Sequence, residues 1–142
     1  MNGYIEHANI TLINPRHTIE FLLAALPDWK IRGQGRMENW HGKDVEWFHV
    51  GNEHSYIALQ SGGDKTLPDW TTHWTGVKHI GIAVDDLSAM VERLSNAGFE
   101  LEHWGGEHPH RRSAYYVDEH NMQFEFVEYF SELPSERNDY SQ

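Results

Sequence analysis

Apolar and polar residues alternate near the start of the chain in a pattern that predicts a β-strand. Between His7 and Leu12 every second residue is apolar, so one face of the strand is apolar and the other carries polar groups. A similar alternation returns between His79 and Val84, with His79, Gly81 and Ala83 on the face opposite the larger apolar residues. Such self-similarity indicates an internal repeat.

A helical pattern of apolar residues follows each of these strands. Pro15 suits the first turn of a helix whose apolar positions continue to Leu26. In the second half, the pair Asp85-Asp86 suits the cap of a helix whose apolar positions continue to Leu94, and Gly98 is a natural end for it. Each half therefore begins with a strand and a helix.

The remainder of each half reads as three strands, which gives two βαβββ units. We expect these strands around residues 30–37, 45–50 and 55–60 in the first half, and around 100–104, 114–117 and 123–128 in the second. The final strand pairs align without a gap when Phe48 is matched to Tyr115. This alignment places Ala58 opposite Glu125, so one repeat has an alanine where the other has a carboxylate.

The expected organisation is a single domain, residues 1–142. The first repeat spans about 3–62, a linker 63–75, the second repeat about 76–130, and a loose acidic C-terminal tail 131–142. In the turn-rich stretch between the repeats we expect Trp70 and Trp74 to be exposed. A module of about 55 residues is marginal alone, so we expect the units to pair within the chain or between chains. Small repeat proteins of this kind commonly associate, and we expect a homodimer.

Composition excludes several classes of function. The formal net charge of −11 disfavours nucleic acid as a partner, because an acidic surface repels phosphates. The sequence has no cysteine, which excludes disulfides, thiol catalysis and thiolate metal sites. No segment approaches the roughly 20 apolar residues of a membrane span, and no basic N-terminal segment precedes an apolar run. We expect a cytoplasmic protein with no membrane partner.

Three side chains with metal-binding chemistry fall at related positions of the repeats. His7 and His79 lie on the polar faces of their strands, and Glu125 points away from its apolar neighbours Phe124 and Phe126. Two imidazoles and one carboxylate form the donor set that favours Fe(II) and also suits Zn, Ni or Mn. A single strand histidine is more often a structural residue, but three such groups on one face predict a divalent metal site.

This arrangement resembles the vicinal oxygen chelate superfamily, which includes glyoxalase I, extradiol dioxygenases and bleomycin resistance proteins. The resemblance covers about residues 3 to 130 and includes the turn that begins at Asp118. There, Glu119 and Asn121 replace the proline and glycine of the family's Asp-Pro-x-Gly turn, and asparagine tolerates the left-handed backbone. The resemblance implies an α+β fold in which paired βαβββ units form a cupped mixed β-sheet with helices on the convex face.

The resemblance also bears on a fourth metal ligand. Glyoxalase I supplies a glutamate from the last strand of its first repeat, where the repeat alignment here puts Ala58. Gln60 lies on the same strand face as Ala58 and is a candidate fourth ligand. The interpretation we favour is that Gln60 is a solvated residue at the end of its strand. The absent carboxylate weakens the case for lactoylglutathione lyase chemistry, in which that group takes part in proton transfer.

The segment containing Tyr115 and Glu125 is similar to the extradiol dioxygenase signature, in which a tyrosine, an acidic turn and the ligand glutamate follow in this order. The resemblance implies that Tyr115 forms a hydrogen bond with an oxygen of a bound catecholate. The alternative interpretation is that Tyr115 is an ordinary cross-strand aromatic residue in a sheet. Those enzymes also use a proton-shuttling histidine, for which His49 and His54 are candidates. The loop with His108 and its neighbouring arginines either contacts an anionic substrate or is simply solvated, and we favour the latter.

The sequence thus predicts a metal-dependent enzyme that acts on a small-molecule substrate chelated through two adjacent oxygens. Extradiol-dioxygenase-like chemistry is favoured over a glyoxalase I-like lyase or isomerase. A non-catalytic drug-binding protein of the bleomycin-resistance type is the alternative from another class, with aromatics such as Trp40, Trp47 and Trp104 lining its pocket. In this superfamily the metal site can form within one chain or between the two chains of a dimer. His7 and His79 can therefore come together in either of these arrangements.

Overall fold

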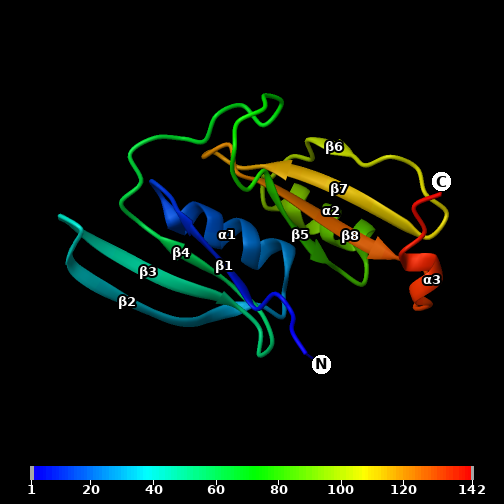
Figure 1. Cartoon of the computed structure of the whole chain (residues 1–142), viewed down its shortest axis with the longest axis horizontal. Helices are drawn as coiled ribbons and strands as arrows, with labels where there is room; N and C mark the ends of the chain where they lie inside the picture. Colours follow the sequence, from blue (N-terminus) through cyan, green and yellow to red (C-terminus); the bar gives the residue numbers. More distant parts are fainter. Residues whose placement is uncertain (1, 142) are drawn as a thin grey trace. The chain divides into compact units, whose positions relative to one another are not determined.

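The computed structural model describes residues 2–141, which divide into two compact units at Thr66 and Leu67. Each unit is one βαβββ repeat, as predicted (Figure 1). The first contains β1 (His7–Thr11), α1 (Pro15–Ala25), β2 (Lys30–Trp40), β3 (Lys43–Gly51) and β4 (Tyr56–Gln60). The second contains β5 (His79–Ala83), α2 (Leu87–Asn96), β6 (His103–Trp104), β7 (Arg111–Val117), β8 (Gln123–Tyr129) and the short α3 (Pro134–Arg137).

The two units have the same sheet topology. The strand orders are β1-β4-β3-β2 and β5-β8-β7-β6, and in each sheet the first strand pairs in parallel with the last. The remaining pairs are antiparallel. A parallel pair needs a crossover connection, and the helix and the two middle strands of each unit supply it. The expected α+β class is therefore confirmed, with the strands arranged as two four-stranded sheets.

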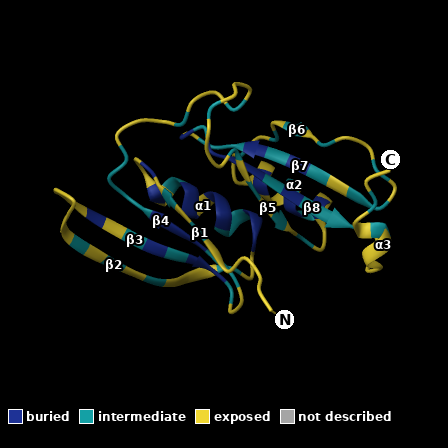
Figure 2. Cartoon of the chain, in the orientation of Figure 1, coloured by how far each residue is buried: buried dark blue, intermediate teal, exposed yellow. Residues whose placement is uncertain are grey.

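The two longer helices, α1 and α2, each lie beside the sheet of their own unit and bury an apolar face (Figures 1 and 2). In the second unit, α2 contacts β7 and β8. The buried side chains of this core are Leu87, Met90, Leu94, Ala114, Tyr116, Phe124 and Phe126. In the first unit the core comprises Phe21, Leu22, Ala25, Phe48, Val50, Ile57 and Leu59. Because successive strand residues point to opposite faces, the polar positions between these residues lie on the other face of each sheet.

The helix ends follow the sequence signals. Pro15 is the first residue of α1, and the Asp86 carboxylate caps α2 by accepting a hydrogen bond from the Ala89 amide at 3.0 Å. Gly98 has a φ of 91° and ends that helix, as glycine does most readily. The Glu128 carboxylate adds a second cap by accepting from the Leu87 amide at 2.7 Å.

The β3–β4 and β7–β8 hairpins differ by one residue in the length of their turns. Gly51 pairs with Tyr56 in the first unit, and Val117 pairs with Gln123 in the second, so the turns comprise residues 52–55 and 118–122. The gapless alignment of Phe48 with Tyr115 is therefore wrong, and His49 is the equivalent of Tyr115. The extra residue is accommodated where Asn121 adopts the predicted left-handed backbone, with a φ of 62°.

Strand β2 is longer than predicted and lies at an edge of its sheet. Its pairing with β3 shifts register twice, between Ile31 and Gly33 and between Met37 and Trp40. Such irregularities bend a strand and increase its twist. The exposed residues along this strand include Lys30, Arg32, Arg36 and Glu38.

The tryptophans of the linker are half-buried, so the expectation of exposed side chains is wrong. Trp70 stacks on His103 with 5.4 Å between ring centroids. The Trp74 indole donates to the Asp69 carbonyl at 3.0 Å, and the Lys78 ammonium lies 4.2 Å from its ring centroid. Aromatic side chains in a polar linker are thus used for local packing.

The C-terminal segment is anchored, contrary to the expectation of a loose tail. It contains α3, and a His108 ring nitrogen lies 2.9 Å from the Asp139 carbonyl. The Arg111 guanidinium donates to the Arg137 carbonyl at 3.2 Å. Polar composition alone did not reveal these partners, because they lie in a loop more than 20 residues away.

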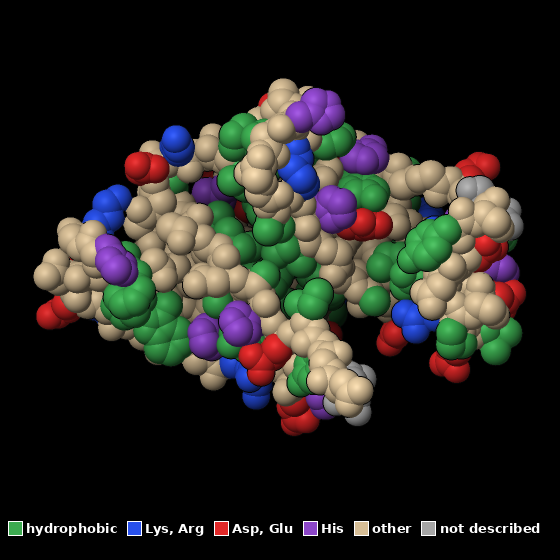
Figure 3. All heavy atoms as spheres, viewed as in Figure 1, with side chains coloured by type: hydrophobic (Ala, Val, Ile, Leu, Met, Phe, Trp, Pro, Cys, Tyr) green, Lys and Arg blue, Asp and Glu red, His purple; other side chains and the backbone are tan. Residues whose placement is uncertain are grey.

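Basic side chains are scattered on the face drawn in Figure 3 and form no single patch there. Within residues 2–141, no helix is long and apolar enough to cross a membrane.

Candidate metal and substrate site

His79 and Glu125 meet on one face of the second sheet. They lie on the adjacent parallel strands β5 and β8, and His79 Nε2 is 3.2 Å from Glu125 Oε1. Glu125 alternates with the buried Phe124 and Phe126, so its carboxylate points away from α2. Both side chains keep some solvent access, at 39% and 21% exposure. Two of the three predicted metal ligands are therefore close together.

Tyr115 lies beside this pair. It is the direct cross-strand neighbour of Glu125, and its ring meets the His79 ring edge-on at 5.8 Å. Burial, the negative charge of Glu125 and a hydrogen bond to that carboxylate raise the pKa of the Tyr115 phenol. The phenol is therefore a neutral hydrogen-bond donor on the same face as the two candidate ligands.

An aromatic wall continues from Tyr115. His103 stacks on the Tyr115 ring with 4.5 Å between centroids and only 5° between planes, and Trp70 in turn stacks on His103. Sequence reasoning missed His103, because the two-residue strand β6 is too short to show an alternation. Its cross-strand pairing with Tyr115 is the signal that identifies it.

His7 occupies in the first unit the place that His79 occupies in the second. Its Nδ1 is 2.9 Å from Glu6 Oε1, and its side chain is 45% exposed. When the carboxylate accepts a hydrogen bond from Nδ1–H, the Nε2 lone pair is left for a metal, which is the usual arrangement around metal-binding histidines. His7 lies in one unit and the other two candidates in the other unit, so their convergence stays a prediction.

The first unit has a cavity where the second has its carboxylate. Asn9 pairs with Ala58 as Gly81 pairs with Glu125, which confirms that Ala58 and Glu125 are equivalent. The cavity has a volume of about 330 Å³. It is lined by Asn9, Met37, Trp40, Trp47, His49, Ala58, Leu59 and Gln60. Gln60 thus faces the same space as Ala58, and the space is largely aromatic and apolar.

His49 is the better supported of the two candidate proton shuttles. It pairs with Ala58, lines the cavity and stacks on Tyr56 at 4.5 Å, and Tyr56 in turn stacks on His7 at 4.7 Å. Burial, followed by the charges of Arg32 and His7, lowers the pKa of the His49 imidazole below 6.5. His49 is therefore neutral at neutral pH and able to accept a proton. His54 lies in the exposed turn between β3 and β4.

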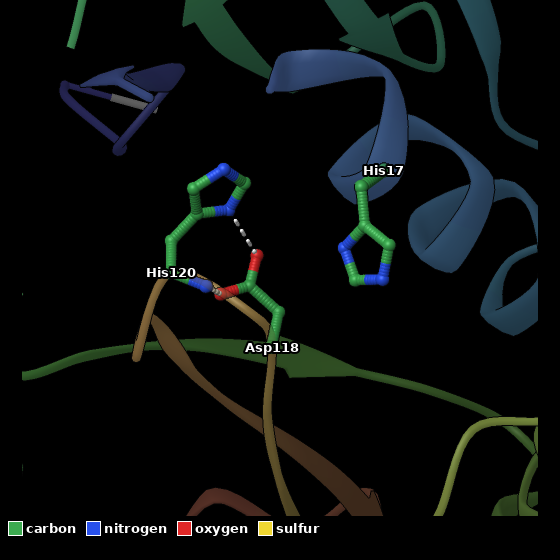
Figure 4. Close-up of side chains that lie close together, drawn as sticks. All are labelled: His17, Asp118 and His120. Carbon is green, nitrogen blue, oxygen red and sulfur yellow. Dashed lines mark hydrogen bonds and ion pairs between the residues drawn. The ribbon is translucent and has the colours of Figure 1, made fainter. Parts of the chain in front are cut away.

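A buried contact between Asp118 and His120 holds the turn that leads into Glu125. Asp118 Oδ2 lies 3.1 Å from His120 Nδ1, and the other carboxylate oxygen accepts from the His120 and Met122 amides (Figure 4). The His120 side chain is 4% exposed. This network fixes the start of β8 and with it the position of Glu125.

The histidines of the loop before β7 are turned toward the C-terminal segment. His108 contacts the Asp139 carbonyl, and His110 Nε2 is 3.3 Å from a Glu136 carboxylate oxygen. The loop is thus neither freely solvated nor arranged around the candidate metal ligands of this unit.

Comparisons with known proteins agree with this fold. The sequence profile described as Glyoxalase/Bleomycin resistance protein/Dioxygenase superfamily matches residues 12–116. No curated protein matches the sequence significantly. A glyoxalase family protein from Bacillus cereus is 20% identical, with a TM-score of 0.70 over 89% of this chain and 94% of its own.

Two further solved structures are similar. A glyoxylase/bleomycin resistance protein/dioxygenase domain from Frankia sp. is 21% identical, with a TM-score of 0.69 over 98% of this chain and 99% of its own. The fosfomycin resistance protein FosX from Listeria monocytogenes, complexed with Mn(II) and sulfate, is 18% identical. Its TM-score is 0.64, over 98% of this chain and 100% of its own. At these identities the likeness establishes the fold.

Proposed function

This chain belongs to the glyoxalase/bleomycin resistance protein/dioxygenase superfamily, and we propose that it is a divalent-metal-dependent enzyme acting on a small substrate through two adjacent oxygens. His7, His79 and Glu125 would hold the ion. The observation that carries the proposal is the 3.2 Å approach of His79 to Glu125, on the sheet face that also presents Tyr115. A bound divalent ion would act there as a Lewis acid on the two substrate oxygens.

The residues present fit such an ion. Two imidazoles and one carboxylate are the donor set of non-haem Fe(II) sites, and they also accept Mn, Ni or Zn. The Glu6 carboxylate beside His7 Nδ1 supplies the outer hydrogen bond that orients a ligating imidazole. The Mn(II) in the FosX structure supports a metal in this fold. We favour Fe(II), because three protein ligands leave room for two substrate oxygens and one further small molecule.

Tyr115 would position the substrate. Its raised pKa keeps the phenol protonated, so it can move its hydrogen bond from Glu125 to a substrate oxygen. His103 stacks on the phenol ring and limits its rotation. Tyr115 is therefore the residue we assign to recognition of a catecholate-like oxygen.

The cavity next to Ala58 would receive the body of the substrate. Its volume of about 330 Å³ lies at the lower end of the range for small-molecule sites, and Trp40 and Trp47 give it flat apolar walls. An alanine at this position cannot remove a proton from carbon, as a glyoxalase I-like reaction requires. His49 can accept a hydroxyl proton instead.

These features favour an aromatic vicinal diol and extradiol-type cleavage. In that reaction the ring carbon–carbon bond next to the diol breaks, and both atoms of O₂ enter the ring-opened product. Dioxygen is the oxidant, so no further reductant is needed. Two other candidate functions are a glyoxalase I-like isomerase, which needs a metal but no O₂, and a drug-binding protein, which needs neither. One experiment on metal content and O₂ uptake therefore distinguishes all three functions.

The test combines metal analysis with activity. Protein purified without chelator is analysed for metals, then reconstituted anaerobically with Fe(II), mixed with a panel of catechols and exposed to O₂. We expect near-stoichiometric metal, O₂ uptake and a ring-opened product. Isomerisation of the methylglyoxal–glutathione hemithioacetal with Ni or Zn, without O₂ uptake, would establish the glyoxalase-type alternative. Metal-free protein that binds planar drugs would establish the binding alternative.

A further inference from the structure

A second cavity lies in the second unit, away from the candidate metal ligands. Its volume is about 720 Å³, and the residues that line it include Trp104, Gly106, Glu107, Arg111, Arg112 and Phe130. Along β7, Arg112 shares a face with the buried Ala114 and Tyr116, and Tyr115 points the other way. The main cationic wall of this cavity is therefore on the face opposite to Tyr115.

The Arg112 side chain is held in place by its neighbours, and its positive charge is free to interact with a ligand. Its guanidinium carbon is 3.8 Å from the centroid of the Trp104 ring, and one of its nitrogens donates to the Ser88 hydroxyl at 3.2 Å. Among residues 2–141 it forms no ion pair. Its cross-strand partner Glu128 is occupied with the amide at the start of α2. The guanidinium of Arg112 is therefore fixed by its neighbours, and its charge is not neutralised by an acidic side chain of the described residues.

Two large aromatic side chains border the same cavity and remain open to solvent. Trp104 is 40% exposed and Phe130 is 56% exposed. A Cβ built on Gly106 meets no atom within 4 Å, so this side of the cavity is open. Glu107 is the acidic lining residue, and it is outnumbered by Arg111 and Arg112. Exposed aromatics around a concave, cationic surface are typical of a ligand site.

We propose that this cavity binds a small planar aromatic carboxylate. The guanidinium of Arg112 has the planar geometry that pairs with both oxygens of a carboxylate. A flat ring attached to that carboxylate would lie against Trp104 and Phe130. The volume is sufficient for one or two fused rings. The site is separate from His79, Glu125 and Tyr115, so ligand binding there does not require the metal.

The experiment compares 2-naphthoate with its neutral analogue 2-naphthamide by calorimetric titration of the full chain in EDTA. We expect saturable binding of 2-naphthoate, at least about tenfold tighter than the amide, because a charge-assisted pair with arginine is lost in the amide. Arg112→Gln should weaken naphthoate binding by about tenfold or more and leave amide binding nearly unchanged. Arg36→Gln, which removes an exposed arginine of the first unit, is the matched control and should have no effect.

A second variant guards against a folding artefact. Gly106→Leu places a side chain into open space and should block both ligands while the far-UV circular dichroism stays unchanged. Equal affinity for naphthoate and the amide, or naphthoate binding that survives Arg112→Gln, would overturn the proposal. So would binding that is lost in Glu125→Gln but kept in Arg112→Gln, because it would place the ligand on the opposite face of the sheet.

Discussion

Ala58 and Glu125 occupy the same position in the two repeats, since Ala58 pairs with Asn9 and Glu125 pairs with Gly81. One repeat therefore supplies the carboxylate, and the other supplies an apolar cavity at the corresponding place. The two halves share a fold, and in the proposed function they would divide the chemistry between them. This division underlies the proposed metal and substrate roles.

The first prediction concerns metal retention. His7→Ala, His79→Ala and Glu125→Ala should each lower metal affinity by at least about 100-fold, because each removes a ligand, and Glu6→Ala should lower it by about tenfold. Competition with a fluorescent chelator measures these changes. His54→Ala, in the exposed β3–β4 turn, is the control. Unchanged affinity in any of the three ligand variants would remove that residue from the site.

The second prediction concerns the position of Ala58. Ala58→Glu should raise metal affinity and reduce oxygenase turnover, because the new carboxylate would fill the cavity and occupy an open coordination position. Metal titration and O₂ consumption measure the two effects. Gln60→Ala should leave metal affinity unchanged. A large loss of metal in Gln60→Ala would instead make Gln60 the fourth ligand.

The third prediction concerns Tyr115. Tyr115→Phe should slow turnover by roughly 100-fold, as expected for loss of one hydrogen bond to developing charge, while the metal stays bound. Steady-state O₂ uptake and metal analysis of the same sample measure both properties. The ring and its stacking on His103 are preserved in this variant. Full activity would reduce Tyr115 to a packing role in the sheet.

The fourth prediction concerns the protonation of His49. In metal-free protein its imidazole should titrate below 6.5, because burial and then the charge of Arg32 lower its pKa. The folded state then binds the proton more weakly than the unfolded chain. The stability contribution of His49 is complete above the unfolded pKa near 6.5 and is lost as the pH falls toward the folded pKa.

Imidazole NMR titration tests the His49 prediction, with His49→Asn used to assign the signal. Arg32→Gln should raise the measured pKa, since it removes a nearby positive charge. A His49 pKa at or above 6.5 in the wild type would contradict the assignment of a neutral proton acceptor.

The fifth prediction concerns the homodimer that we propose. If each site combines His7 of one copy with Glu125 of another, mixing His7→Ala with Glu125→Ala should restore about a quarter to a half of the activity, because each mixed dimer has one intact site. Light scattering establishes the dimer independently. A dimer that gains no activity on mixing would place each site within a single chain, and a monomer would contradict the dimer altogether.

Much of the architecture follows from local patterns in the sequence. The alternation around His7 and His79 predicts the first strand of each unit, and Pro15, Asp86 and Gly98 mark helix ends where the structure has them. These signals are strong because they depend on backbone geometry and on solvent exposure, which act locally. The shared face of His79 and Glu125 follows from the two-residue period of a strand.

Features that depend on distant partners could not be predicted. The match of Phe48 to Tyr115 failed because turn length is set by local backbone conformation, and one turn holds an extra residue. His103 and Trp70 showed no pattern, because a two-residue strand and a linker have no periodicity. The place of His7 relative to Glu125 depends on how two units associate, which no local signal encodes.

The irregular edge strand β2 also bears on how the protein behaves at high concentration. An exposed edge of 11 residues is a potential template for strand addition by other chains. The two register shifts against β3 oppose such addition because they break the flat row of hydrogen-bonding groups. The exposed charged side chains Arg32, Arg36 and Glu38 also oppose it. We therefore expect the strand that lies farthest from β1 in its sheet to resist strand addition by other chains.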